Sequence, residues 1–237
     1  MSLPRGVVAY GNNNIEFSFF YVKRKTLEIA VHPDQAVVIK APLGTDIEEI
    51  KRKVIKRAAW IKKQRTFFRQ FEPRTPARRY VGGETHLYLG RHYRLRIQKG
   101  EQDAVRLRKG FFEIQVKEKI TSERIRGLLE EWYREKAKVK FNESLDRCWV
   151  YVKKVLKIKP TLQMRSMKKR WGSLSPQGRL TLNLELIKAP PECIDYVVVH
   201  ELSHLRYEHH GPEFYAFLDK VMPDWEKRKH RLEVTLA

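Results

Sequence analysis

The motif His-Glu-Leu-Ser-His at residues 200–204 limits the fold more than any other stretch of the chain. It directly follows the apolar run "YVVV", and Pro191 stands before that run, where the first turn of a helix accepts proline. This pattern predicts a helix over residues 191–208 that packs an apolar side against a core. His200 and His204 then lie one turn apart on the same face, where two imidazoles can bind one metal ion.

The residues around this pair favour a catalytic zinc site, which takes three protein ligands and leaves one position for water. His210 is the expected third ligand, because Gly211 ends the helix and lets the side chain turn back toward the pair. Glu201 lies beside the pair, in the position that a general base requires. The simpler alternative is that the two histidines only form a polar helix edge. Other candidates for the third ligand are His209, Glu208, Glu213, Asp219 and Asp224.

The remaining sequence predicts an α+β fold with two domains. The β-rich N-terminal domain, residues 1–120, includes one basic helix. The domain at residues 121–237 is mainly helical and carries the histidine motif and a small β-hairpin. The expected strands, in order, lie at residues 15–25, 26–33 and 36–42, in hairpins at 84–100 and 104–116, and in a pair within 162–186; the expected helices lie at 44–71 and 122–156.

The net charge of +21 is concentrated in two stretches. Residues 51–80 hold twelve Lys and Arg residues against one acid, and residues 151–170 hold eight against none. These stretches suggest contact with nucleic acid, which Trp60 and neighbouring phenylalanines could extend by stacking. The simpler interpretation is that the aromatic residues lie in a core, the cations face solvent, and attraction to nucleic acid is weak and non-specific.

The composition also indicates where the protein works. Cys148 and Cys193 are the only cysteines, which argues against a disulfide scaffold and favours a reducing cytoplasm. The apolar runs are only a few residues long, so we expect no membrane span. The N-terminus has no basic start followed by an apolar block, so we expect no signal peptide.

Residues 170–218 resemble the YgjP-like metallopeptidases, relatives of the SprT-like zinc proteases. "YLGRHYRLRI" and "WYREKAK" extend the resemblance more loosely over most of the chain. It implies a zincin-like domain, zinc ligation by His200, His204 and His210, and hydrolysis of peptide or protein substrates. One departure is Leu174, where the family often has Cys. The shared positions are Trp171, Gly172, Ser173, Leu182, Asn183, Tyr196, Val197, residues 200–205, His210 and Phe214.

We therefore expect a zinc-dependent metallopeptidase in which Glu201 is the general base. One alternative is a DNA-associated protease of the SprT-like class, and another is a non-enzymatic binding module with a structural zinc. Trp171, Gly172 and Ser173 either pack in the core or line the substrate cleft. Asn183 orients a ligand or ends a strand, and Asp195 is expected to be a surface or first-turn acid. Candidates for stabilising the transition state are Arg165, Arg170, Tyr207 and Tyr215.

Overall fold

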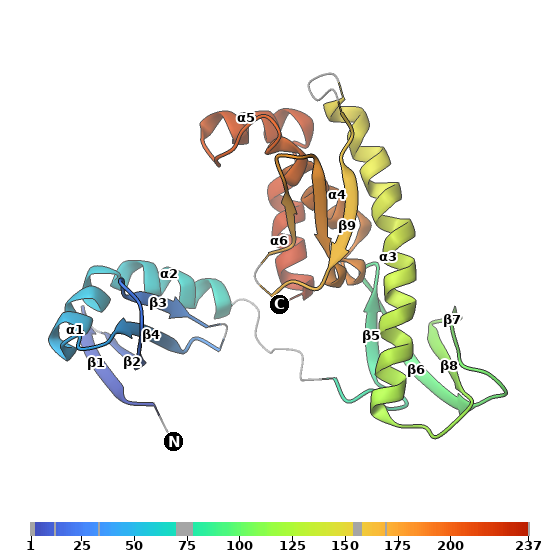
Figure 1. The fold of residues 1–237 in the computed structure, drawn as a ribbon, viewed down its shortest axis with the longest axis horizontal. Coiled ribbons are helices and arrows are strands. Elements are labelled where there is room, and N and C mark those ends of the chain that lie inside the picture. The colour runs from blue at the N-terminus through green and yellow to red at the C-terminus, as the bar shows by residue number, and fades with distance from the viewer. Residues whose placement is uncertain are drawn as a thin grey trace. The chain divides into compact units, whose positions relative to one another are not determined.

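The computed structural model describes residues 3–11, 13–32, 34–69, 78–153, 158–168 and 170–236. It confirms an α+β fold with mixed sheets and helices (Figure 1). The chain forms two compact units, Met1–Thr75 and Pro76–Ala237, each with its own buried core. Every helix in the described ranges is too short or too polar to span a membrane.

The first unit is a four-stranded sheet with two helices packed on it. Its strand order is β1-β2-β4-β3, and β2 runs parallel to β4 while the two outer pairs are antiparallel. Ile50, Val54 and Ile61 recur at helical spacing and are fully buried against the sheet. The elements are β1 (Arg5–Tyr10), β2 (Asn13–Val22), β3 (Glu28–Val31), β4 (Val37–Pro42), α1 (Ile47–Lys56) and α2 (Ala58–Arg69).

Two features of this unit differ from the sequence prediction. Strand β1 was not predicted, because its short run is interrupted by exposed residues. The helix predicted over residues 44–71 is two helices that meet at Arg57, whose φ and ψ of −103° and 6° leave the helical region. The end of the predicted helix, from residue 70 onward, lies outside the described residues.

The second unit begins with a sheet that repeats the strand order and the pairing directions of the first. Its order is β5-β6-β8-β7, with β6 parallel to β8 and both outer pairs antiparallel. Both predicted hairpin segments are present as strand pairs, and the turn between β7 and β8 falls at Lys109-Gly110 as expected. The strands are β5 (Thr85–Tyr88), β6 (Arg91–Lys99), β7 (Ala104–Arg108) and β8 (Phe111–Val116).

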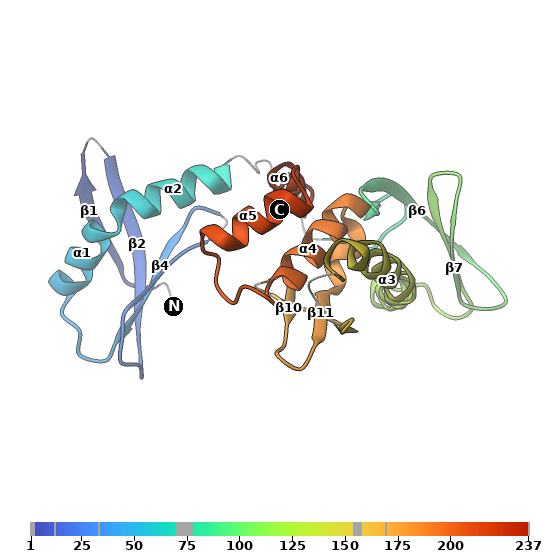
Figure 2. The ribbon, with the colours of Figure 1, turned by 90° about the horizontal axis from the view of Figure 1, so that it is seen from above.

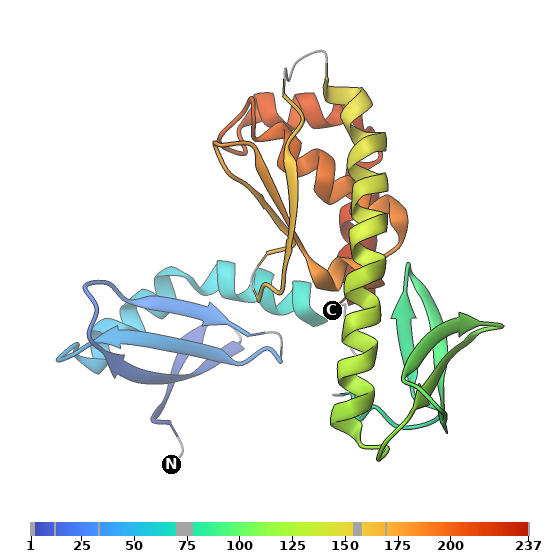
Figure 3. The same cartoon turned by 45° about the vertical axis from the view of Figure 1, so that its right-hand side comes forward.

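Helix α3 (Ser122–Val152) is the long element that connects this sheet to the histidine motif. At 1.5 Å per residue it spans about 46 Å. Its first half packs on the sheet, where the ring centroids of Trp132 and Phe112 lie 5.0 Å apart. Its second half lies along α4 (Pro191–Ser203) (Figures 1 and 3). The boundary between the two compact units falls at Thr75–Pro76, whereas the sequence predicted a domain boundary at residues 120–121. The reason is that the second sheet buries its apolar face on α3.

The segment that carries the motif is a three-stranded sheet followed by a short 3₁₀ helix and three α-helices. Helix α4 contacts both α3 and α6, and β10 contacts α4 (Figure 2). The predicted turn at residues 175–178 is confirmed by a hydrogen bond of 2.9 Å from Gly178 N–H to the Ser175 carbonyl. The elements are β9 (Thr161–Arg165), β10 (Gly172–Leu174), β11 (Arg179–Asn183), the 3₁₀ helix η1 (Leu184–Lys188), α4 (Pro191–Ser203), α5 (Pro212–Val221) and α6 (Trp225–Leu236).

Candidate metal centre

Helix α4 carries the first part of the motif and ends earlier than predicted, at Ser203 rather than residue 208. The Ser203 hydroxyl donates a hydrogen bond to the Val199 carbonyl, a side-chain contact that competes with the helix ladder. His204 is the residue after the helix, but its φ of −67° and ψ of −16° are still helical. Its ring therefore lies one turn from His200, with 5.2 Å between the ring centroids.

His210 joins this pair from the chain reversal that precedes α5. Pro212 occupies the first turn of α5, as the sequence predicted. Gly211, which was expected to end the preceding helix, is instead the N-cap of α5, because that helix already ends at Ser203. The Nε2 atoms of His210 and His200 are 3.0 Å apart. One nitrogen from each of the three rings lies within 4.8 Å of the others.

The other candidate ligands lie outside this group. Among the described His, Cys, Asp and Glu residues, the cluster has only His200, His204 and His210 as members. Asp219 accepts a hydrogen bond from Trp225 Nε1 at 2.6 Å, and Asp224 pairs with Arg228. Glu208, His209 and Glu213 are exposed.

The ring of Phe214 packs against all three imidazoles. Its side chain is completely buried, and its ring centroid lies 5.1, 4.9 and 4.7 Å from those of His200, His204 and His210. His204 Nδ1 donates to the Tyr207 carbonyl at 3.0 Å, so this nitrogen carries the proton and Nε2 keeps its lone pair free. Sequence reasoning did not foresee the Tyr207 contact, because a backbone carbonyl leaves no signal in residue type.

The donor set fits a zinc-like cation. Two nitrogens bound tetrahedrally at 2.0–2.1 Å would be about 3.3 Å apart, close to the Nε2 distance between His200 and His210. Metal binding requires neutral imidazoles. Burial, helped by the neighbouring His210 and His204, lowers the pKa of His200 to about 4, and burial also lowers the pKa of His210. The lowered pKa values of His200 and His210 favour the neutral form that can bind a metal.

Glu201 lies between α4 and strand β10, where only 9% of its surface is exposed. A Cβ atom added to Gly172 would stand 2.7 Å from Glu201 Cγ and 2.8 Å from Oε1, so the glycine makes room for this carboxyl group. Burial raises the pKa of Glu201 to about 7, against a smaller opposing effect of Arg170. A carboxyl group with this pKa can accept and release a proton near neutral pH.

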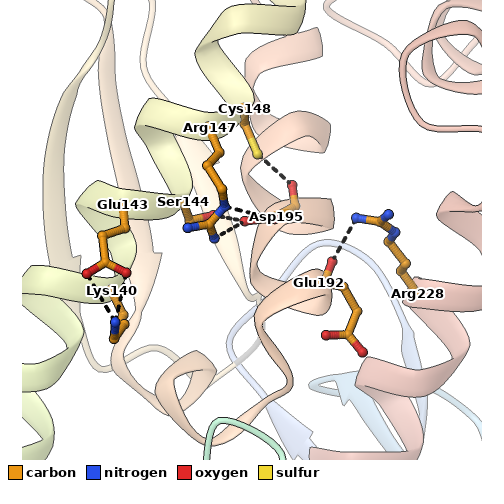
Figure 4. A network of polar contacts seen from close by, with 8 residues as sticks. All are labelled: Lys140, Glu143, Ser144, Arg147, Cys148, Glu192, Asp195 and Arg228. Atoms are coloured by element: carbon orange, nitrogen blue, oxygen red, sulfur yellow. Dashed lines mark hydrogen bonds and ion pairs between the residues drawn. The ribbon is translucent and has the colours of Figure 1, made fainter.

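Two polar residues whose roles the sequence did not settle, Asn183 and Asp195, make hydrogen bonds that hold neighbouring segments together. Asn183 is buried, and its Nδ2 donates to the carbonyls of Met167 and Arg170, so it ties these two residues to the end of β11. Asp195, which was expected to be a surface or first-turn acid, accepts hydrogen bonds from Ser144 and Arg147 of α3 (Figure 4). Asp195 therefore fixes α4 against α3.

The four candidates for stabilising the transition state differ in position. Arg170 acts electrostatically on Glu201, and the ring of Tyr215 stacks on His210 with 6.3 Å between centroids. Tyr207 contributes the carbonyl that holds His204. Arg165 lies in β9, paired in register with Asn183.

The raised pKa of Glu201 predicts a pH-dependent stability difference in the metal-free protein. The folded state binds an extra proton between the ordinary pKa of 4.5 and about 7. Stability from that proton is complete below pH 4.5 and is lost as the pH rises through 7. Glu201→Gln stays neutral, so its free energy of unfolding relative to wild type should rise by about 3 kcal/mol between pH 4.5 and 8.

Urea denaturation of both proteins after metal removal measures this difference. The titration of His200 opposes that of Glu201 in wild type, but it is common to both proteins and cancels in the comparison. If the difference in free energy of unfolding between the two proteins stays constant between pH 4.5 and 8, the pKa of Glu201 is not raised in the folded protein.

The chain was compared with known proteins and with a family model. No curated protein matches the chain. Similar solved structures include the metallopeptidase zymogen abylysin of Pyrococcus abyssi (23% identity, TM-score 0.36, 40% of this chain and 94% of that chain). They also include the metallopeptidase zymogen jannalysin of Methanocaldococcus jannaschii (17% identity, TM-score 0.37, 41% of this chain and 91% of that chain). The family model of the YgjP-like metallopeptidase domain matches residues 25–235. The chain therefore belongs to the YgjP-like family of metal-dependent peptidases.

Proposed function

We propose that the protein is a zinc-dependent peptidase with a zincin-like site in the second unit. In this proposal His200, His204 and His210 hold the ion and Glu201 is the general base. The observation that carries it is the convergence of three imidazole nitrogens within 4.8 Å, next to a buried carboxyl group whose pKa is about 7. Both cysteines are buried and unpaired, which supports the reducing, cytoplasmic setting.

The chain's own residues supply positioning and proton transfer. A zinc ion held by the three nitrogens would supply Lewis acidity toward the scissile carbonyl and the attacking water. Glu201 accepts a proton from that water and returns it to the leaving nitrogen, a role that suits its raised pKa. Phe214 and the Tyr207 carbonyl keep the imidazoles in place throughout.

Strand β10 is the expected docking place for the peptide substrate. It is the end strand of its sheet in the described chain, paired on one side with β11. An extended peptide can add to such an edge through main-chain hydrogen bonds. Because Gly172 of β10 touches Glu201, a peptide aligned with β10 would pass close to the general base.

The ligand assignment predicts that His210→Ala weakens zinc binding and His209→Ala does not. Both changes remove one exposed imidazole from the same turn, but only His210 lies in the cluster. We expect one zinc ion per wild-type chain and an affinity loss of at least about tenfold in His210→Ala. Competition with a chromogenic chelator measures both variants. Equal affinities for the two variants would remove His210 from the ligand set.

The general-base assignment predicts that Glu201→Gln keeps its zinc but hydrolyses peptides roughly 10²- to 10⁴-fold more slowly. Glu208→Gln, a matched change at an exposed position, should hydrolyse like wild type. Zinc content and cleavage of a denatured protein such as casein are measured on the same samples. If Glu201→Gln keeps every measurable activity, the non-enzymatic alternative with a structural zinc is favoured.

The contact between β10 and Glu201 predicts that Gly172→Ala slows hydrolysis while zinc stays bound. The new methyl group needs the space that Glu201 Cγ and Oε1 occupy, so the carboxyl group has to move. Gly127→Ala in α3 is the control, because a Cβ there meets no atom within 4 Å. A Gly172→Ala protein with wild-type kcat would show that the position of Glu201 tolerates displacement.

A further inference from the structure

The first unit contains a groove of about 670 Å³ that is separate from the histidine cluster. Helices α1 and α2 form one wall, and the segment leading into β3 forms the other. Leu27, Ile29 and Pro42 contribute apolar surface to it. This volume lies in the range of pockets that bind small molecules or short polymer segments.

The rim of the groove is strongly positive. Lys25, Lys53, Lys56 and Arg57 line it, and Glu49 is the only acid among the lining residues. Within the described chain none of these four cations forms an ion pair, although other lysines of the same unit do. Their charge is therefore available to an anionic ligand.

An aromatic side chain stands among these cations. Trp60 lines the same groove and is 38% exposed, so it is not the core residue that the sequence favoured. Lys53 and Lys56 of α1 and Trp60 of α2 all line the groove, so they surround the same opening although the two helices meet at Arg57. An indole between lysines offers a stacking surface next to cations for phosphates.

We infer that this groove binds single-stranded nucleic acid. The phosphates contact the lysines and Arg57, and one base stacks on Trp60. A single strand is favoured over a duplex, because the face of a base is free for stacking only when the base is unpaired. An acidic peptide fits less well, since carboxylates gain most from the bidentate fork of arginine and three of the four cations are lysines.

The test measures binding of the full-length protein to a fluorescently labelled oligothymidylate by anisotropy at several salt concentrations. Lys53→Glu/Lys56→Glu should weaken binding at least about tenfold and lower the salt slope by roughly 0.7 per lost phosphate contact. Trp60→Ala should weaken it about fivefold or more, and Trp60→Phe should keep most of the affinity. The labelled duplex should bind more weakly than the single strand.

Arg106→Glu/Arg108→Glu is the matched control, because it changes the net charge equally at exposed positions of β7. This control should bind nearly as well as wild type. Three results would overturn the inference: equal weakening by the control, no effect of Trp60→Ala, or tighter binding of a labelled polyglutamate that the groove variants abolish. Peptide hydrolysis is not measured in any arm, so the outcome is independent of the proposed peptidase function.

Discussion

The burial of α4 between its neighbours is the constraint on which the candidate site depends. Val198, Val199 and Leu202 are fully buried, and the helix contacts α3, α6 and β10. Apolar packing alone would tolerate small rotations of a helix, but the Asp195 carboxylate is bonded to Ser144 and Arg147 of α3 (Figure 4). This polar anchor sets the rotation of α4 and hence the direction in which the motif residues point.

Burial also sets the electrostatics of the site. It lowers the pKa of His200 and raises that of Glu201, so both groups favour their neutral forms in the protein without a cation. Neutral imidazoles are ready to bind a metal ion, and its positive charge would in turn favour ionised Glu201. The same low-polarity environment therefore favours neutral imidazoles and raises the pKa of the carboxyl group beside them.

The two units share a topology but differ in chemistry. Both sheets follow the same order and pairing directions, a repeat that the sequence does not reveal because strand order depends on distant pairings. The first unit covers its sheet with α1 and α2, which carry the cationic groove. The second covers its sheet with α3, which then runs along α4, the helix that carries His200. The basic surface of α1 and α2 and the proposed catalytic site therefore belong to different units.

The sequence by itself determined the features that depend on near neighbours: His200 and His204 one turn apart, the start of α5 at Pro212, and the paired strands with their turns. These follow from side-chain periodicity and from glycine and proline, which act over a few residues. Only the tertiary structure decided that His210 rather than His209 joins the cluster, that Gly172 makes room for Glu201, and that the second sheet belongs with α3. The physical reason is that these contacts join segments far apart in the chain, where packing and burial, not local pattern, select the partner.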